Sequence, residues 1–341
     1  MSAKPLKVCN TCKREYFKEQ DFLVNTTRWR MCERGNLWFN CDCNSTNMII
    51  KGKFDWYSPE MFLSGEAKSV FNTLPALKEL PHIPTSVMEL QQLIRDENSS
   101  AAQMAKVSRQ DPLIAGNILK IANNLKASTG TRIESLEHAI SFIGLNSLSD
   151  IILTASIGSF PFKTTVFNQD EFWEESFLVG KIAEAVAQKF APDLIADEVY
   201  LAGALANVGK VVLAICFPEE ADKIAADCKD IKKLKSWISG EVTHNVHSHS
   251  VLGEIAASFW GLPEYILVAA SSHHSLPTTR PEEPAGVDDV VRLANQLAHW
   301  VLLEPTKISE NLLKSMSDRF RISAPDMDKL VEELIPLKEA S

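Results

Sequence analysis

Five of the seven cysteines in this 341-residue chain lie within its first 43 residues, and their spacing suits metal chemistry. They are Cys9, Cys12, Cys32, Cys41 and Cys43. Two residues separate Cys9 from Cys12, which lets one tight turn present two thiolates to the same ion. Cys32 together with Cys41 or Cys43 can complete a tetrahedral set. The pattern therefore predicts a structural zinc site, with the choice between Cys41 and Cys43 left open.

The segments around these cysteines must form the element that positions them. Aromatic and β-branched residues gather at 22–24, 27–30 and 37–39, which is typical of short β-strands. We expect residues 1–50 to form a small β-rich, zinc-ribbon-like module, because so small a core needs a metal to hold it. Arg28 and Arg30 flank Trp29, and such interleaving can bind nucleic acid. A strand with Trp29 inward and both arginines outward is the simpler interpretation.

Charge and hydropathy limit the function classes that fit the rest of the chain. The net charge is −9, and the acidic excess lies entirely beyond residue 60, so most of the surface should repel nucleic acid. The longest apolar run, residues 211–217, is too short to span a bilayer, and the polar start does not resemble a secretory signal. We expect a cytoplasmic protein that makes no membrane contact.

Helix signals follow one another from about residue 80 onward, with almost no strand pattern. The fold class predicted is mainly α, an all-helical bundle after the small β-rich module. Helices are predicted at about 146–159, 171–189, 197–216, 250–259, 263–274, 287–303, 308–319 and 324–337. Residues 51–73 are interpreted as a connector, residues 74–275 as the main domain, and residues 276–341 as C-terminal helices packed on the bundle.

The motifs of this bundle occur in the order found in HDOD domains, which they resemble over about residues 74–275. The matching segments are Leu80-Pro81-His82-Ile83-Pro84, Asp111-Pro112-Leu113, residues 133–145, Phe172-Trp173-Glu174-Glu175-Ser176, residues 204–210 and Gly261-Leu262-Pro263. HDOD domains are relatives of the HD phosphohydrolases that generally lack the full metal-ligand set and are associated with bacterial signalling and regulation. The resemblance implies an HD-superfamily-like bundle that acts as a binding or output module.

The resemblance also implies that the primary metal ligands are altered here. The His-Asp pair of the superfamily stands as Ala206 and Asn207, its first His as Glu175 and its final Asp as Asn295. A methyl group cannot coordinate a cation, and a neutral amide is a poorer ligand than a carboxylate. We therefore expect no catalytic residue and a degenerate pocket. Its expected members are Glu175, Ala206, Asn207, Lys210, His249, His273, His274 and Asn295.

Three histidines match the extra metal ligands of the related HD-GYP phosphodiesterases. His249, His273 and His274, with Glu175, would suit a transition metal. The simpler interpretation is that they are hydrogen-bonded pocket residues or helix caps. Consecutive helical residues point about 100° apart, so His273 and His274 are not expected to converge on one ion.

Three functions remain. We expect a non-catalytic bacterial signalling adaptor, in which the cysteine module and the bundle bind protein partners, a nucleotide messenger, or both. The first alternative is a divergent metal-dependent phosphohydrolase, which would need a bound cation to activate water. The second is a nucleic-acid-associated regulator acting through the cysteine module, with salt-sensitive binding that depends on Arg28 and Arg30.

Overall fold

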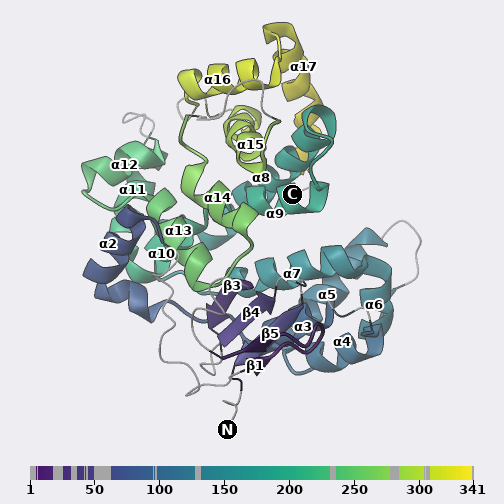
Figure 1. The fold of residues 1–341 in the computed structure, drawn as a ribbon. Helices are drawn as coiled ribbons and strands as arrows, with labels where there is room; N and C mark the ends of the chain where they lie inside the picture. The colour runs from purple at the N-terminus through teal and green to yellow at the C-terminus, as the bar shows by residue number, and fades with distance from the viewer. Residues whose placement is uncertain are drawn as a thin grey trace. The chain divides into compact units, whose positions relative to one another are not determined.

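The computed structural model describes residues 5, 7–17, 26–31, 37–41, 43, 45–49, 63–94, 96, 98–126, 132–230, 236–276, 284–302, 304 and 308–339. Within these ranges the fold is mainly helical, and the two small sheets belong to the N-terminal residues, as predicted (Figure 1). The chain divides into two compact units. One comprises Met1–Met61, Pro81–Phe160 and Ser258–Leu262, and the other Phe62–Leu80, Pro161–Ala257 and Pro263–Ser341. The domain boundaries at residues 50, 73 and 275 stay predictions.

The first unit contains both sheets. Strands β1 (Lys7–Val8) and β2 (Glu15–Tyr16) pair antiparallel, and β3 (Thr26–Met31), β4 (Leu37–Cys41) and β5 (Thr46–Ile49) form an antiparallel sheet with β4 in the middle. The strands predicted at 27–30 and 37–39 lie within β3 and β4, whereas 22–24 lies outside the described residues. Among the described residues of the two sheets, Cys9, Tyr16, Leu37, Phe39, Cys41 and Ile49 form a small buried core.

Five helices complete most of the first unit: α3 (Thr85–Ile94), α4 (Ala101–Ser108), α5 (Pro112–Leu125), α6 (Leu136–Ile143) and α7 (Leu145–Gly158). Asp111 caps α5 by accepting hydrogen bonds from the N–H groups of Leu113 and Ile114. Gly144, at a φ of 84°, makes the turn between α6 and α7. The indole of Trp260 donates to the Pro81 carbonyl at 2.7 Å and thus ties residues 258–262 to this unit.

The second unit is entirely helical within the described residues. It comprises α2 (Gly65–Thr73), η2 (Pro75–Glu79), α8 (Gln169–Phe190), α9 (Ala196–Leu205), α10 (Val208–Cys216), α11 (Pro218–Lys229), α12 (Trp237–Thr243), most of α13 (His249–Phe259), α14 (Glu264–Ser272), α15 (Val287–Val301), α16 (Glu310–Phe320), α17 (Ala324–Leu334) and α18 (Pro336–Glu339). The sequence did not predict α12.

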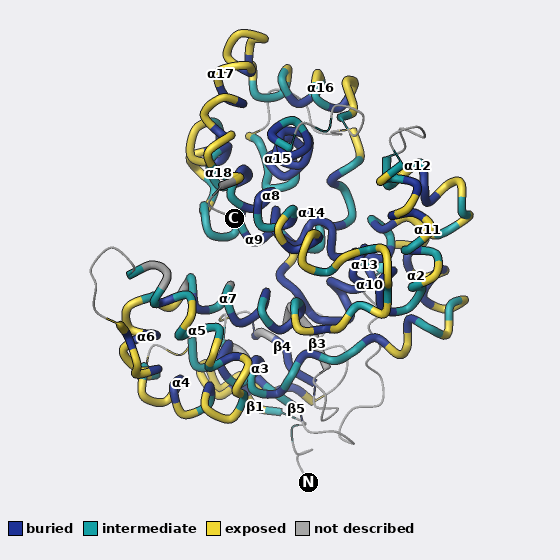
Figure 2. Tube along the Cα trace, turned by 180° about the vertical axis from the view of Figure 1, so that it is seen from behind, coloured by how far each residue is buried: buried dark blue, intermediate teal, exposed yellow. Residues whose placement is uncertain are grey.

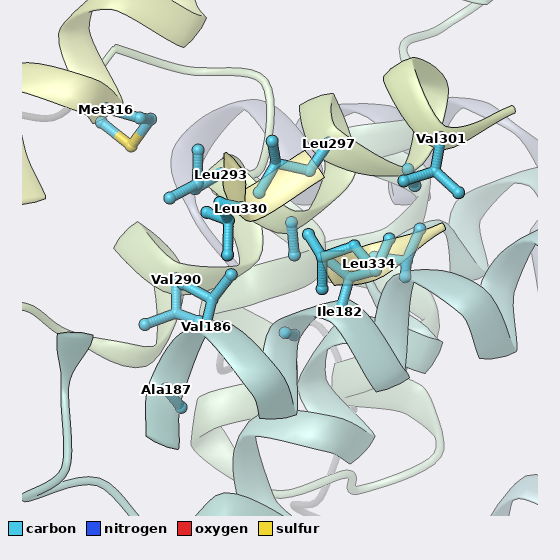
Figure 3. Close-up of a cluster of buried hydrophobic side chains, with 14 of the residues drawn as sticks. Ile182, Val186, Ala187, Val290, Leu293, Leu297, Val301, Met316, Leu330 and Leu334 are labelled. Carbon is cyan, nitrogen blue, oxygen red and sulfur yellow. The ribbon is translucent and has the colours of Figure 1, made fainter. Parts of the chain in front are cut away.

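Helix α15 is the central element of the second unit. It is buried along most of its length (Figure 2) and packs against α8, α9, α14, α16 and α17. Figure 3 shows Ile182 and Val186 of α8 with Leu293 and Leu297 of α15 and Leu330 of α17 in one buried apolar cluster. Burial of these side chains contributes about 1.5–3 kcal/mol each, so this cluster fixes α8 and α15 as the frame of the site.

The helix predicted at 197–216 is interrupted at Ala206 and Asn207, and that prediction is corrected to two helices, α9 and α10. Asn207 adopts φ −89° and ψ 14°, outside the helical range, and its side chain bonds to α15 instead. By length and composition, α9 and α10 together, Ala196–Cys216, form a candidate for a membrane span among the described residues. However, 83% of its most apolar window is buried inside the fold, so packing accounts for its apolar character.

Candidate functional site

Four of the five N-terminal cysteines come together. Cys9 and Cys12 lie on the turn between β1 and β2, Cys41 ends β4, and Cys43 lies in the turn between β4 and β5. All four sulfur atoms are within 4.8 Å of one another. The Cys9 and Cys43 sulfurs are 3.7 Å apart, and those of Cys12 and Cys41 are 3.5 Å apart. Tetrahedral zinc, with Zn–S bonds of about 2.3 Å, separates its sulfurs by about 3.8 Å, so the cluster fits a metal ion. Cys32 lies outside the described residues.

Polar neighbours prepare Cys9 to act as a ligand. The Ser45 hydroxyl lies 3.1 Å from the sulfurs of both Cys9 and Cys43, and the Asn47 amide donates to Cys9 at 3.6 Å. Burial opposes ionisation of Cys9, but hydrogen bonds from Ser45 and from N–H groups of the turn outweigh it and lower the thiol's pKa to about 6. Because the thiolate is the metal-binding form, these contacts favour coordination.

Asn207 and Asn295 form a neutral, buried pair. The Asn207 Nδ2 donates to the Asn295 Oδ1 at 3.2 Å, and the two residues are 4% and 1% exposed. Ala206 lies in an apolar cluster with Ala202, Ala269 and Val291. None of these three positions carries a charge, and the two amides use part of their hydrogen-bonding capacity on each other. The arrangement has little to offer a divalent cation.

Gly209 allows α10 to approach the start of α13. A Cβ atom at this position would fall against the carbonyl oxygen of His249 and 2.7 Å from the nitrogen of Gly253. Backbone atoms cannot move aside as a flexible side chain can, so the close approach requires glycine. This contact fixes His249 beside α10.

His249, His273 and His274 converge, which the spacing argument did not anticipate. The Nε2 of His249 lies 3.1 Å from the Nε2 of His273 and 3.0 Å from that of His274. The reason is that α14 ends at Ser272 with His273 as its C-cap. His274 therefore lies beyond the regular helix, and the helical angle between neighbours no longer applies.

Two of these imidazoles are oriented through their other ring nitrogen. The Nδ1 of His249 lies 2.7 Å from the Glu241 carboxylate, which also accepts from the His249 backbone N–H at 2.8 Å and from the Trp237 indole at 3.1 Å. The Nδ1 of His273 lies 3.1 Å from two backbone carbonyl oxygens of α14. Sequence reasoning missed Glu241, because it sits on the unanticipated helix α12 and no motif marks it.

Burial keeps the three imidazoles neutral. It lowers the pKa of His249, although the Glu241 carboxylate opposes this shift. Burial, followed by the neighbouring imidazoles and Lys210, holds the pKa of His273 and His274 well below the usual range. Neutral imidazole is the form that binds metal ions, so the cluster offers three nitrogen donors.

A pocket of about 780 Å³ is formed by the second unit. Of the eight residues predicted for the degenerate pocket, five line it: Glu175, Asn207, Lys210, His274 and Asn295. The other three, Ala206, His249 and His273, are fully buried and are not part of the lining. Aromatic side chains of α8 and α12 and the amide of Gln296 complete the wall.

Lys210 brings a buried positive charge to this pocket. It is 8% exposed, and its ammonium lies 5.1 Å from the centre of the Trp237 ring. Among the described residues no carboxylate or hydrogen-bond acceptor contacts that ammonium, whereas Lys229, on the same wall, pairs with Glu171 at 2.8 Å. A buried ammonium with no carboxylate beside it can bind an anion.

The nucleic-acid interpretation concerns residues whose side chains are not described. Arg28, Trp29 and Arg30 lie in β3, but the placement of their side chains is outside the described part of the chain. Binding of nucleic acid through this segment stays a prediction.

Comparison with known proteins identifies a family. The sequence profile of the HDOD domain matches residues 80–276, more than half of the chain. A curated but uncharacterised protein of Treponema pallidum (strain Nichols) is 22% identical over 248 residues, which cover 73% of this chain and 47% of the relative. The chain thus spans about half the length of this relative.

Three solved structures share the fold. An HDOD domain protein of unknown function from Geobacter sulfurreducens is 21% identical, with 80% of this chain and 95% of that chain covered and a TM-score of 0.61. A Shewanella amazonensis SB2B protein provisionally named a phosphohydrolase is 19% identical, covering 77% and 94%, with a TM-score of 0.58. A Marinobacter aquaeolei VT8 protein provisionally named for signal transduction is 18% identical, covering 82% and 65%, with a TM-score of 0.60. Taken with the family match, these likenesses lead to one identification: the chain belongs to the HDOD-domain family.

Proposed function

We propose that this HDOD protein is a non-catalytic signalling adaptor that binds protein partners and takes a phosphate-bearing small molecule, such as a nucleotide messenger, into its pocket. The observation that carries the proposal is the hydrogen-bonded amide pair of Asn207 and Asn295, at the positions where the wider superfamily holds metal with carboxylates. A neutral pair beside a methyl group gives no support to the two-metal or metal-hydroxide chemistry that a phosphohydrolase needs.

The chemistry of the pocket supports an anionic ligand. Lys210 supplies a buried positive charge without a carboxylate partner among the described residues. The Asn295 Nδ2, a donor, and the Asn207 Oδ1, an acceptor, are buried and have no hydrogen-bond partner among the described residues. A ligand that satisfied these groups would gain hydrogen bonds that are costly to leave unmade. Glu171, Glu174 and Glu175 on the same wall limit how much negative charge the ligand can carry.

The cysteine cluster is proposed to hold a structural zinc ion. Its four sulfurs have the spacing of a tetrahedral site, and the buried core in the described part of this small module is too small to fold alone. The module would then serve as a rigid surface for a protein partner. We further propose that the adaptor works in the cytoplasm, where free thiols stay reduced and available to metal.

A divergent phosphohydrolase is the second candidate, because the cluster of His249, His273 and His274 could support metal-dependent chemistry. The Shewanella neighbour carries a phosphohydrolase name, and the Marinobacter neighbour carries a signal-transduction name. Whether the protein hydrolyses a phosphodiester distinguishes the two candidates.

The test combines calorimetric titration with an activity assay. Cyclic dinucleotides are titrated into the wild type, into Lys210→Gln and into Lys223→Gln, which changes an exposed lysine of the neighbouring α11. We expect binding without hydrolysis, weakened roughly tenfold or more by Lys210→Gln and unchanged by Lys223→Gln. Folded protein that gives no heat would exclude the messenger, and metal-dependent hydrolysis of a phosphodiester would exclude the non-catalytic role.

A further inference from the structure

The histidine cluster contains a hydrogen-bonding conflict that the described residues do not resolve. The Nδ1 of His249 faces the Glu241 carboxylate, which only accepts, so that nitrogen carries the proton of the neutral ring. The Nδ1 of His273 faces two carbonyl oxygens and is protonated for the same reason. Both Nε2 atoms are then bare lone pairs, yet they lie 3.1 Å apart.

Two lone pairs that face each other at this distance repel unless a cation lies close to both. A proton on the His249 Nε2 would make that fully buried ring an imidazolium beside Glu241, and it could point to only one of the neighbouring Nε2 atoms. His274 adds a third Nε2, which lies 3.0 Å from that of His249. One proton cannot bridge three nitrogens, whereas one metal ion can bind all three.

We propose that His249, His273 and His274 bind one divalent transition-metal ion, at a site separate from the cysteine cluster. With Zn–N bonds of about 2.0 Å, a tetrahedral zinc ion holds its nitrogen ligands about 3.3 Å apart. The two Nε2–Nε2 separations in the structure, 3.1 and 3.0 Å, are close to this value. Imidazole nitrogens suit zinc and its neighbours in the first transition row better than calcium or magnesium.

The surroundings have the form that metal-binding histidines require. Glu241 orients the His249 ring and places a buried negative charge near the ion, and two backbone carbonyls orient the His273 ring. Glu241 is itself held by the Trp237 indole. Gly209 allows the close approach that sets His249 in place. The outer contacts thus fix two of the three ligands before any metal arrives.

Three protein ligands leave a position of the ion open. His274 is the one member of the cluster that lines the pocket, so the open position is reached from there. Glu175 lines the same pocket but is not part of the converging ligand group, so it is not counted as a ligand. A small anion entering the pocket would meet both the metal and Lys210. The metal site itself does not depend on the proposed adaptor role.

The test counts zinc in the complete chain after loading and desalting. Elemental mass spectrometry compares the wild type with His274→Ala, which removes the least buried of the three imidazoles, and with Cys9→Ser/Cys12→Ser, which removes the other cluster. We expect about two zinc ions per wild-type chain and about one in each variant. His247→Ala, at an exposed histidine just before α13, is the matched control and should keep both ions.

Cobalt titration gives a second readout that does not need the His274→Ala variant to fold. Cobalt bound by thiolates absorbs strongly through sulfur-to-metal charge transfer, and cobalt bound by imidazoles does not. In Cys9→Ser/Cys12→Ser, we expect weak visible bands without charge transfer. One zinc ion per wild-type chain, or loss of zinc in His247→Ala as well as in His274→Ala, would overturn the proposal. Either result is independent of whether a cyclic dinucleotide binds or is hydrolysed.

Discussion

The cysteine cluster and the histidine cluster bring metal-ligating atoms together in opposite ways. The cysteines lie on a turn and at a strand end of a small module, and two of them, Cys12 and Cys43, are exposed. The histidines come from the start of α13 and the end of α14 and are held by a carboxylate on α12. In the first region, we expect folding of the module to depend on metal binding. In the second, the packed helices make the site, and the metal adds to a structure that already exists.

The largest effect is expected when the cysteine cluster is removed. In Cys9→Ser/Cys12→Ser the module should lose its fold, because structural zinc supplies about 10–16 kcal/mol in small metal-dependent folds and no large core replaces it. Hydrogen exchange should show lost protection at residues 37–49, with the helical circular dichroism largely retained. Cys228→Ser, in α11, is the control. Unchanged protection of β4 and β5 would show that this region does not depend on its metal.

The next effect is expected at Gly209, where packing builds the histidine cluster. Gly209→Ala should lower the free energy of unfolding by about 3 kcal/mol and release the histidine-bound metal, because the added Cβ presses on the His249 backbone. Gly116→Ala is the matched control, since no atom lies within 4 Å of a Cβ there and the change should stabilise α5 by about 0.5–1 kcal/mol. Urea unfolding measures both. Equal effects at the two glycines would contradict the packing argument.

Zinc itself should stabilise the histidine region without being needed for its fold. In Cys9→Ser/Cys12→Ser, zinc at about one hundred times its dissociation constant should add about 2.7 kcal/mol to the stability of the helical unit. Adding His274→Ala to this variant should abolish the gain. Thermal unfolding with and without zinc gives the measurement. If the helical unit unfolded completely without zinc, both regions would depend on metal for folding, which would contradict the comparison.

Asp222 makes the stability of the protein depend on acid pH without involving either metal-ligand cluster, so it serves as a comparison. Burial raises its pKa, but the backbone N–H groups of Phe167, Thr165 and Val166 and the Thr165 hydroxyl outweigh this and lower it to about 2. Because the folded-state pKa lies below the ordinary value of 3.8, the stabilisation is complete above about pH 4 and is lost as the pH falls to about 2. Asp222→Asn should cost about 1–2 kcal/mol at neutral pH, and this cost should shrink as the pH falls through about 2. A cost that stayed the same from pH 7 to well below pH 2 would contradict this assignment.

The smallest effect is expected at the amide pair. Asn207→Ala leaves the Asn295 Oδ1 without its hydrogen bond and should cost about 1 kcal/mol. The zinc count should not change, since neither amide is a ligand in this account. Loss of one zinc ion in this variant would indicate that the amide pair contributes to the metal site assigned here to the histidines.

The sequence predicted what depends on local spacing. The Cys9 to Cys12 interval, the helical periodicity and the ordered family motifs led to the metal-fitting cysteine cluster, the mainly helical class and the HDOD family. It did not predict the convergence of His273 and His274, because this depends on where α14 ends. The role of Glu241 depends on the packing of α12 against α13, which periodicity does not reveal.

The most direct test of two different metal centres is X-ray absorption at the zinc edge of the zinc-loaded wild-type chain. We expect two shells of ligand atoms, sulfur at about 2.3 Å and nitrogen at about 2.0 Å, from two zinc ions per chain. A sulfur shell alone, from a single zinc ion per chain, would contradict it.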